Sequence, residues 1–389
     1  MKNEPNIRIK GFEGEWKECT FNNLVDRISS YSSSKSLPTV EFEDIISGEN
    51  RLNKDVYSKP IHKGGIAFEK NDVLFGKLRP YLKNILFATF NGIAVGDFWV
   101  LRANESYPAF VYTLVNNKSF MDVANISSGS KMPRADWNLV SKHKFLVPSF
   151  FEQRAIATYF RHLDSLIEIA DKKVASLKQV KEASLQSMFP KEGQKVPEVR
   201  FKGFEGEWKV CQGEDLFETY NERNRPDLPV LSAFQDIRGM AVRSDSGYEI
   251  SHNKRNEVTY KVVKPGQFVM HLRSFQGGFA HSSIEGITSP AYTVFGFKES
   301  NANNDYYWKT IFMSKEFIDR LKTITYGIRD GRSISFPEFL KMKFRVPSID
   351  EQRKIASFFV HLDKQIAIAQ QRLDLLRRIK SACLNEMFV

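Results

Sequence analysis

The chain has 389 residues, of which 42% are hydrophobic and 26% charged, a balance typical of globular proteins with room for two or three domains. Its net charge of +11 suits a polyanionic partner, with nucleic acid as the first candidate. The N-terminus lacks the apolar region of a signal peptide, and no apolar run approaches a membrane span, so secreted and membrane classes are not expected. Cys19, Cys211 and Cys383 form no CxxC pair, which favours reduced thiols in a cytoplasm and offers no metal site.

The chain repeats itself. Residues 5–17, PNIRIKGFEGEWK, recur at 197–209 as PEVRFKGFEGEWK, with 10 of 13 positions identical. Residues 147–189 recur at 346–388 with 21 of 43 positions identical. The offset grows from 192 to 199, so the second half carries seven extra residues (199 − 192) in its interior. Matches at both ends of each half indicate a duplication. It predicts two variable domains, 1–146 and 191–345, alternating with two similar segments, 147–190 and 346–389.

The variable domains are expected to be strand-rich. Apolar and polar residues alternate between Gly, Asn and Asp breaks over 64–78, 84–103, 257–273 and 291–299. Short helices are expected at 107–124 and 305–323. An offset of 194 places residues 72–80 on 266–274, which aligns Arg79 with Arg273.

The two similar segments are expected to be long helices. Their apolar residues recur at alternating four- and three-residue spacings, the period of a coiled coil. Ser149 with Glu152, and Ser348 with Glu351, predict a capping box at each helix start. Antiparallel pairing within the chain is the simplest arrangement, and pairing with other subunits is the alternative. The fold class is therefore α/β (α+β) with a pseudo-twofold duplication. The expected seam and subunit contacts are Ile156, Phe160, Leu163, Ile167, Val174, Leu177, Ile355, Phe359, Leu362, Ile366, Leu373 and Leu376.

No catalytic motif is recognisable. The chain has no GxxxxGK[ST] loop, no GxGxxG after a strand, no amino-methyltransferase tetrapeptide and no metal-ligand spacing. We therefore expect no catalytic residue, metal or cofactor in this chain. The phrase HLD occurs at 162–164 and at 361–363. We expect structural hydrogen bonds there rather than catalysis, because neighbouring helix positions face different directions.

Four basic loops are the remaining candidate binding sites. Residues 77–84, 127–137, 271–278 and 326–335 combine Lys and Arg with Ser, Gly or Tyr. Such loops can approach phosphates and reach base edges. Each could also be a solvated loop, but their recurrence in both halves favours binding. The candidate DNA contacts are Lys77, Arg79, Tyr81, Lys83, Ser130, Lys131, Arg134, His271, Arg273, Ser274, Gln276, Arg329, Arg332 and Ser333.

With these motifs in order, the chain resembles the specificity (S) subunit of type I restriction–modification systems. The resemblance rests on VPSFFEQRAIA and VPSIDEQRKIA at the helix starts, on KLRPYL, and on the similar opening of each half. It implies that 1–146 and 191–345 are target recognition domains, each reading one half of a split DNA target. It also implies that the helices form an antiparallel coiled coil that docks two methyltransferase (M) subunits. Those would bring S-adenosylmethionine, and restriction (R) subunits would bring ATP and Mg, whereas the S subunit is not catalytic.

Two other functions compete with this interpretation. A self-sufficient DNA methyltransferase or nuclease needs a motif that the sequence does not contain. A coiled-coil scaffold without a DNA role leaves the charge of +11 and the basic loops unexplained.

Overall fold

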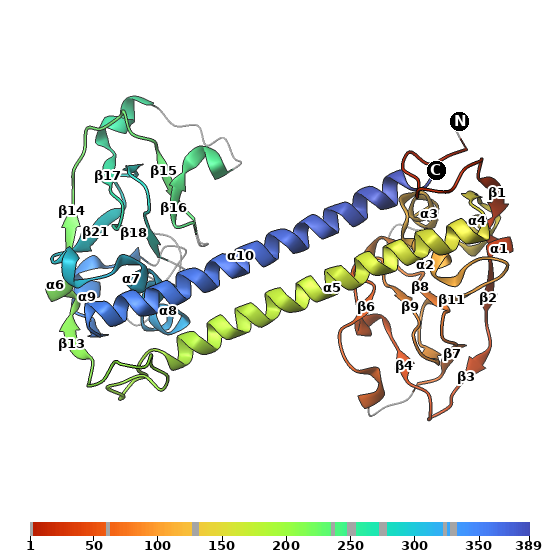
Figure 1. Ribbon diagram of the computed structural model, residues 1–389, viewed down its shortest axis with the longest axis horizontal. Helices are drawn as coiled ribbons and strands as arrows, with labels where there is room; N and C mark the ends of the chain where they lie inside the picture. The colour runs from red at the N-terminus through yellow and green to blue at the C-terminus, as the bar shows by residue number, and fades with distance from the viewer. Residues whose placement is uncertain are drawn as a thin grey trace. The chain divides into compact units, whose positions relative to one another are not determined.

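The computed structural model describes residues 3–59, 63–126, 132–234, 238–246, 254–271, 278–321, 325–326 and 333–389. The chain forms two compact units, one of Met1–Lys172 with Gln370–Val389 (unit 1) and one of Lys173–Ala369 (unit 2). The division runs through both long helices, α5 (Phe150–Ser187) and α10 (Ile349–Glu386) (Figure 1). Each unit thus combines a strand-rich domain with a part of each helix. Within the described ranges, no helix is both long and apolar enough to cross a membrane.

Unit 1 contains two four-stranded sheets and two strand pairs. One sheet has the order β2-β11-β8-β9 with all neighbours antiparallel, and the other has the order β3-β7-β10-β4, in which only β10 and β4 run parallel. The pairs are β1-β12 and β5-β6. The strands are β1 (Lys17–Thr20), β2 (Val25–Ile28), β3 (Tyr31–Ser32), β4 (Thr39–Val40), β5 (Ile45–Ile46), β6 (Arg51–Leu52), β7 (Gly65–Phe68), β8 (Val73–Gly76), β9 (Ile85–Phe87), β10 (Gly92–Ala94), β11 (Phe98–Ala103) and β12 (Lys144–Val147).

Unit 2 repeats the principal sheet in the order β14-β21-β18-β19. The sequence offset of 194 also relates equivalent strands of the two units, because β19 and β20 begin 194 residues after β9 and β10. The expectation of a duplicated, strand-rich fold is confirmed. The strands are β13 (Lys209–Gln212), β14 (Phe217–Tyr220), β15 (Leu231–Ala233), β16 (Met240–Val242), β17 (Lys261–Val263), β18 (Phe268–Met270), β19 (Phe279–His281), β20 (Gly286–Thr288), β21 (Thr293–Phe297), β22 (Thr325–Tyr326), β23 (Ser333–Ile334) and β24 (Lys343–Val346).

The single helices expected at 107–124 and 305–323 are each two helices. Asn117 adopts extended backbone (φ −73°, ψ 154°), and its side chain accepts a hydrogen bond from the Ser119 N–H, which ends one helix and starts the next. Ser314 has the same role in unit 2, where its Oγ accepts from the Phe317 N–H at 3.2 Å. The remaining helices are α1 (Phe21–Leu24), α2 (Pro108–Asn116), α3 (Lys118–Ala124), α4 (Trp137–Lys142), α6 (Gly213–Leu216), α7 (Asp305–Phe312), α8 (Lys315–Leu321) and α9 (Phe336–Leu340). The 3₁₀ turns are η1 (Phe42–Asp44), η2 (Val56–Ser58), η3 (Pro80–Leu82), η4 (Arg243–Ser246), η5 (Lys254–Thr259) and η6 (Ser300–Ala302).

The long helices pair antiparallel within each unit. In unit 1, Lys380 Nζ lies 2.6 Å from Asp164 Oδ1, and Arg377 lies 3.6 Å from Asp171, so numbers fall along α10 as they rise along α5. In unit 2, Lys181 Nζ lies 2.6 Å from Asp363 Oδ1, which is the same ion pair in the second copy. The aspartates of both HLD phrases therefore hold the helices together, as the expectation of a structural role required.

The residues of the predicted seam are buried or half-buried. Eight of its members are buried, namely Ile156, Phe160, Leu163, Val174, Ile355, Phe359, Leu362 and Leu373. Four are half-buried, namely Ile167, Leu177, Ile366 and Leu376. The domain boundaries expected before residues 147 and 346 fall inside β12 and β24, and each helix begins three residues later, at Phe150 and Ile349.

Each helix ends in an aromatic core. In unit 1, Phe388 stacks on Phe110 with ring centroids 5.8 Å apart and meets Trp16 edge-on at 6.1 Å. In unit 2, Phe189 meets Trp208 edge-on at 6.2 Å. Both tryptophans are buried, so each anchors the repeated segment in the core of its domain.

The repeated N-terminal segment fastens each domain to the start of its helix. Arg8 donates from Nε and Nη2 to the Glu152 carboxylate, both at 2.8 Å, and from Nη1 to the Gly14 carbonyl at 2.6 Å. Arg200 repeats this in unit 2 with Glu351 and Gly206, with all three bonds at 2.7 Å.

The two loop glycines have φ of +86° (Gly14) and +81° (Gly206), a region that costs glycine least. The predicted capping boxes form only the first of their two hydrogen bonds, so this prediction is wrong for the second. Ser149 Oγ does accept from the Glu152 N–H at 3.4 Å, but the Glu152 carboxylate accepts from Arg8 instead of the Ser149 N–H.

Candidate nucleic-acid interface

A strained basic turn follows β8 in unit 1. Arg79 (φ 49°, ψ 61°) and Lys83 (φ 51°, ψ 49°) flank η3, and both have left-handed backbone. This conformation costs a non-glycine residue about 1–2 kcal/mol, so it persists only where the surroundings hold it, commonly at functional sites. Pro80 is buried, whereas Arg79 and Tyr81 are exposed. The turn therefore presents an arginine and an aromatic ring at the surface.

The second predicted basic loop of unit 1 lies beside this turn. The Arg79 N–H donates to the Pro133 carbonyl at 2.7 Å, and the Ala135 N–H donates to the Lys77 carbonyl at 2.9 Å. Leu78 and Arg134 form an antiparallel bridge between these bonds. Two loops about fifty residues apart in the sequence thus form one surface.

Asp97 orients two cations of this surface, and no motif marks it in the sequence. Its Oδ2 accepts from Arg134 Nε at 3.1 Å and Nη2 at 3.0 Å, while its Oδ1 lies 3.4 Å from Lys77 Nζ. Its backbone carbonyl also accepts from the Lys77 N–H at 2.8 Å. In the sequence, Asp97 could have been found only through its place between the turn at Gly96 and strand β11, where rigid neighbours position polar side chains.

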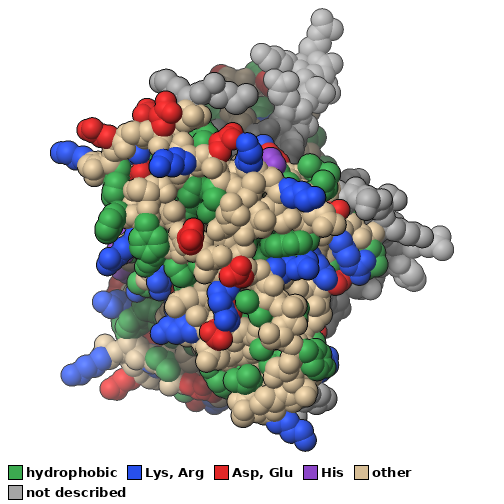
Figure 2. All heavy atoms as spheres, turned by 90° about the vertical axis from the view of Figure 1, so that its right-hand side faces the viewer, with side chains coloured by type: hydrophobic (Ala, Val, Ile, Leu, Met, Phe, Trp, Pro, Cys, Tyr) green, Lys and Arg blue, Asp and Glu red, His purple; other side chains and the backbone are tan. Residues whose placement is uncertain are grey.

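Two of the four cations of this surface, Lys77 and Arg134, pair with Asp97. Arg79 and Lys83 form no ion pair among the described residues. Figure 2 shows one face of unit 1, on which lysines and arginines are interspersed with acidic side chains. Net charge alone therefore does not mark an interface on that face. The strained turn and the oriented cations make this surface a candidate, because phosphates take charge-assisted hydrogen bonds and base edges take bidentate arginine contacts.

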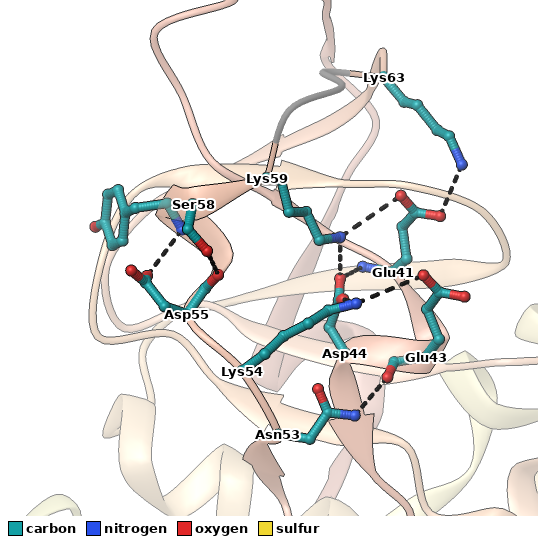
Figure 3. A network of polar contacts seen from close by, with 10 residues as sticks. Glu41, Glu43, Asp44, Asn53, Lys54, Asp55, Ser58, Lys59 and Lys63 are labelled. Atoms are coloured by element: carbon teal, nitrogen blue, oxygen red, sulfur yellow. Dashed lines mark hydrogen bonds and ion pairs between the residues drawn. The ribbon is translucent and has the colours of Figure 1, made fainter.

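A second polar network of unit 1 is structural (Figure 3). Asp44 is fully buried and accepts a hydrogen bond from Lys59, while Lys54 Nζ lies 2.9 Å away. Burial alone would raise the pKa of Asp44, but hydrogen bonds from Lys59, the Glu41 N–H and Lys54 outweigh it and lower the pKa. Lys63 pairs with Glu41 at 3.0 Å. These charges compensate one another and tie residues 53–59 to η1.

In unit 2, most candidate contacts lie outside the described residues. These are Arg273, Ser274, Gln276, Arg329 and Arg332, together with Ser130 and Lys131 in unit 1. The Ser333 backbone lies in β23, which pairs with β22. His271 is 9% exposed, and its ring packs 6.1 Å from that of Tyr292, so it belongs to the domain interior and not to an exposed loop.

A His–Asp pair in unit 2 had no signal in the sequence. His281 Nε2 lies 2.7 Å from Asp305 Oδ2, and the histidine side chain is buried. Burial would raise the pKa of Asp305, but its hydrogen bond and charge interaction with His281 lower it. At the offset of 194 the first copy has Phe87 in this position, so the repeat did not reveal the pair. It fastens the start of α7 to β19. Among the described residues, no group of three His, Cys, Asp or Glu could hold a metal ion.

Comparison with known proteins gives a family match and a curated relative. Residues 206–378 match the family described as type I restriction modification DNA specificity domain. The chain is 21% identical over 291 residues to the type I restriction enzyme MjaVIII specificity subunit of Methanocaldococcus jannaschii, covering 70% of this chain and 67% of that protein.

Two solved structures share the fold. The type I restriction–modification S subunit from M. genitalium superposes with a TM-score of 0.63 at 12% identity, over 99% of both chains. A chain from a study of complex assembly and conformational transition of the type I R-M system superposes with a TM-score of 0.51 at 16% identity, over 95% of this chain and 96% of that one.

Proposed function

The chain belongs to the family of specificity subunits of type I restriction–modification systems, and from this premise we propose that it reads a DNA target in two halves. The domain of unit 1 reads one half-site, and the domain of unit 2 reads the other. The subunit recognises DNA and leaves catalysis to its partners. This assignment is preferred over both a self-sufficient methyltransferase and a scaffold without a DNA role.

The duplication carries this proposal. Both units have the same order in the principal sheet and the same arginine fastening at the domain start. The loops expected to touch DNA differ between the halves in length and composition. One scaffold with two different reading surfaces suits a bipartite, asymmetric target. In unit 1 the reading surface is the turn of Lys77, Arg79, Tyr81 and Lys83 with Arg134 beside it.

The helices are proposed to dock two M subunits. Ile169 and Val180 are exposed apolar residues of α5, and Ile368 and Ile379 are their exposed equivalents 199 residues later in α10. Exposed apolar side chains at repeated positions favour a partner that binds twice in the same way. A duplicated chain can present two such sites, one for each copy of an M subunit.

The cofactors are proposed to reside in the partners. S-adenosylmethionine would bind to the M subunits, while ATP and Mg would bind to the R subunits. The assembled complex would act on double-stranded DNA in the cytoplasm.

Exchange of one domain tests the half-site assignment. Residues 1–146 are replaced by the equivalent block of another family member, and methylated sites are mapped across the host genome. We expect one half of the target to change and the other to stay. The reciprocal exchange of 191–345 is the matched control and should change the opposite half. A change in both halves after either exchange would contradict the modular assignment.

Arg79→Ala tests the reading surface of unit 1. In a gel shift of the assembled complex, the loss should be about 1–3 kcal/mol if Arg79 reads a base. Lys70→Ala, an exposed lysine elsewhere in unit 1, is the control and should leave target affinity nearly unchanged. Equal affinities for all three proteins would remove the turn as a contact site.

A further inference from the structure

Unit 2 has a groove between α5, α7 and α10, hereafter the unit 2 groove. Its cavity volume is about 440 Å³. Its apolar lining includes Tyr306, Met313 and Val360, which are 36%, 37% and 44% exposed. Apolar side chains that meet in a groove and remain this exposed commonly mark a contact site for another protein.

The rim of the unit 2 groove is basic. Lys178, Lys181, Lys309 and Lys364 line it together with two carboxylates, Glu182 and Asp363. Lys181 is paired with Asp363 at 2.6 Å. Lys178 and Lys364 form no ion pair with any carboxylate in the described ranges. The groove therefore offers two lysines beside an apolar floor.

The equivalent place in unit 1 is covered by the protein itself. The turn between β5 and β6 supplies Asn50, whose Nδ2 donates to Asn116 Oδ1 at 2.7 Å. In the same turn Glu49 lies 3.9 Å from Arg377, and Arg51 lies 3.1 Å from Asp171. A segment with a carboxylate thus packs onto the paired helices of unit 1.

The duplication relates these contacts to the unit 2 groove. Met313 directly precedes the capping residue Ser314, as Asn116 directly precedes the capping residue Asn117, with an offset of 197. Lys178 occupies the α5 position that Arg377 has in α10, with an offset of 199. In unit 1, Arg377 faces Glu49, whereas in unit 2 the equivalent Lys178 lines the open groove. Where unit 1 has a buried Asn116, unit 2 has a half-exposed methionine.

We infer that the unit 2 groove binds an acidic segment with apolar side chains from a methyltransferase subunit, in the place that the β5–β6 turn takes in unit 1. Carboxylates of that segment face Lys178 and Lys364, and its apolar side chains cover Met313 and Val360. This inference rests on the proposed docking of M subunits and adds that the two docking sites differ. The copy beside unit 2 makes a contact that is already filled within unit 1.

A protein segment fits the unit 2 groove better than DNA. Phosphates would be satisfied by the lysines but would leave Met313 and Val360 against a charged backbone. An amphipathic segment satisfies both, since grooves of this kind bind side chains at helical spacing. Charge complementarity at the rim would mainly set the orientation and rate of docking.

The test measures assembly of the full chain with the M subunit of the same system. Sedimentation velocity and native mass spectrometry count the bound copies, and titration gives the affinity of each. We expect Lys178→Glu with Lys364→Glu to weaken one of two copies at least tenfold. Met313→Asn, which installs the residue of unit 1, should weaken the same copy several-fold. Lys202→Glu with Lys298→Glu changes the same charge at exposed positions of unit 2 outside the paired helices and is the matched control.

The outcomes separate the inference from the proposal beneath it. If the wild type binds two M subunits and the groove variants bind both as tightly as the control does, the inference is wrong and the proposed function stands. If the wild type binds no M subunit, both fail. If the groove variants lose DNA affinity without a change in assembly, DNA occupies the groove and the inference is overturned. Single variants at Lys364 and Met313 serve if the double variant does not fold.

Discussion

The ion pair between Arg8 and Glu152 allows a quantitative prediction of the stability of unit 1. Arg8→Met removes two hydrogen bonds to a carboxylate that is 2% exposed, and it keeps most of the aliphatic stem. Losing one partner of a buried ion pair costs about 3–5 kcal/mol, because the remaining charge is left unpaired. The Arg8 side chain is 18% exposed, so water recovers a part of this loss. We expect a decrease of about 3 kcal/mol in the free energy of unfolding of unit 1.

Urea denaturation gives the magnitude, and hydrogen exchange locates it. The Ile7 N–H donates to the Glu386 carbonyl and the Trp16 N–H to the Asn3 carbonyl, both at 2.9 Å. Amides of residues 3–17 should exchange faster in Arg8→Met, whereas residues 195–209 should keep their rates. Arg200→Met should reverse this pattern. Lys144→Met is the control, since its ion pair with Glu18 has the same 2.8 Å length but is exposed on both sides.

The result that would refute this reasoning is specific. If Arg8→Met and Lys144→Met have equal stabilities and residues 3–17 keep their exchange rates, burial of Glu152 does not make the pair important. The repeated segment would then be held by Trp16 and by the hydrogen bond from the Ile7 N–H to the Glu386 carbonyl.

Three further predictions follow from features of unit 1. Asp44→Asn should lower the stability of unit 1 by about 2 kcal/mol at neutral pH. Because folding lowers the pKa of Asp44, the wild type keeps its full stability advantage above the ordinary pKa of about 3.9 and loses it as the pH falls through the folded pKa. Urea titrations at several pH values would measure this loss. Phe388→Ala should cost about 3–5 kcal/mol because it empties the space between Trp16 and Phe110, whereas Val389→Ala, at an exposed position, should change the unfolding curve little. Gly14→Ala should cost about 1 kcal/mol or more in thermal unfolding through its φ of +86°, since a Cβ there would meet no atom within 4 Å; an unchanged melting temperature would mean that the loop can relax.

The sequence predicted the duplication and the helices because both depend on local pattern. A heptad spacing and the repeat of residues 5–17 at 197–209 can be recognised without knowing what lies nearby in space. The same sequence contained Arg8 and Glu152, but they are 144 positions apart, and nothing local indicates that one binds the other. The capping box was predicted for that reason, as the nearest partner in sequence was the serine. A distant arginine outcompetes it because a bidentate ion pair is stronger than one hydrogen bond to a backbone N–H.

The candidate site was predictable in its cations but not in its geometry. The basic loops of Lys77 and Arg134 were recognised separately by composition. Asp97, which orients both, carries no motif, and the left-handed backbone of Arg79 has no sequence signature outside glycine and asparagine. The break at Asn117 was missed since helical periodicity continues through it. Its capping side chain decides the break only when the chain packs.

The aromatic residue at the end of α10 has a consequence for synthesis. Unit 2 is built from one continuous stretch of chain, whereas unit 1 combines Met1–Lys172 with Gln370–Val389. Domains generally fold as units while the ribosome extends the chain from its N-terminus. Phe388, which stacks on Phe110, leaves the ribosome after all of unit 2. Most of unit 1 is therefore translated before unit 2, but its core is completed after unit 2. Until Phe388 has been released from the ribosome, Trp16 lacks this neighbouring ring.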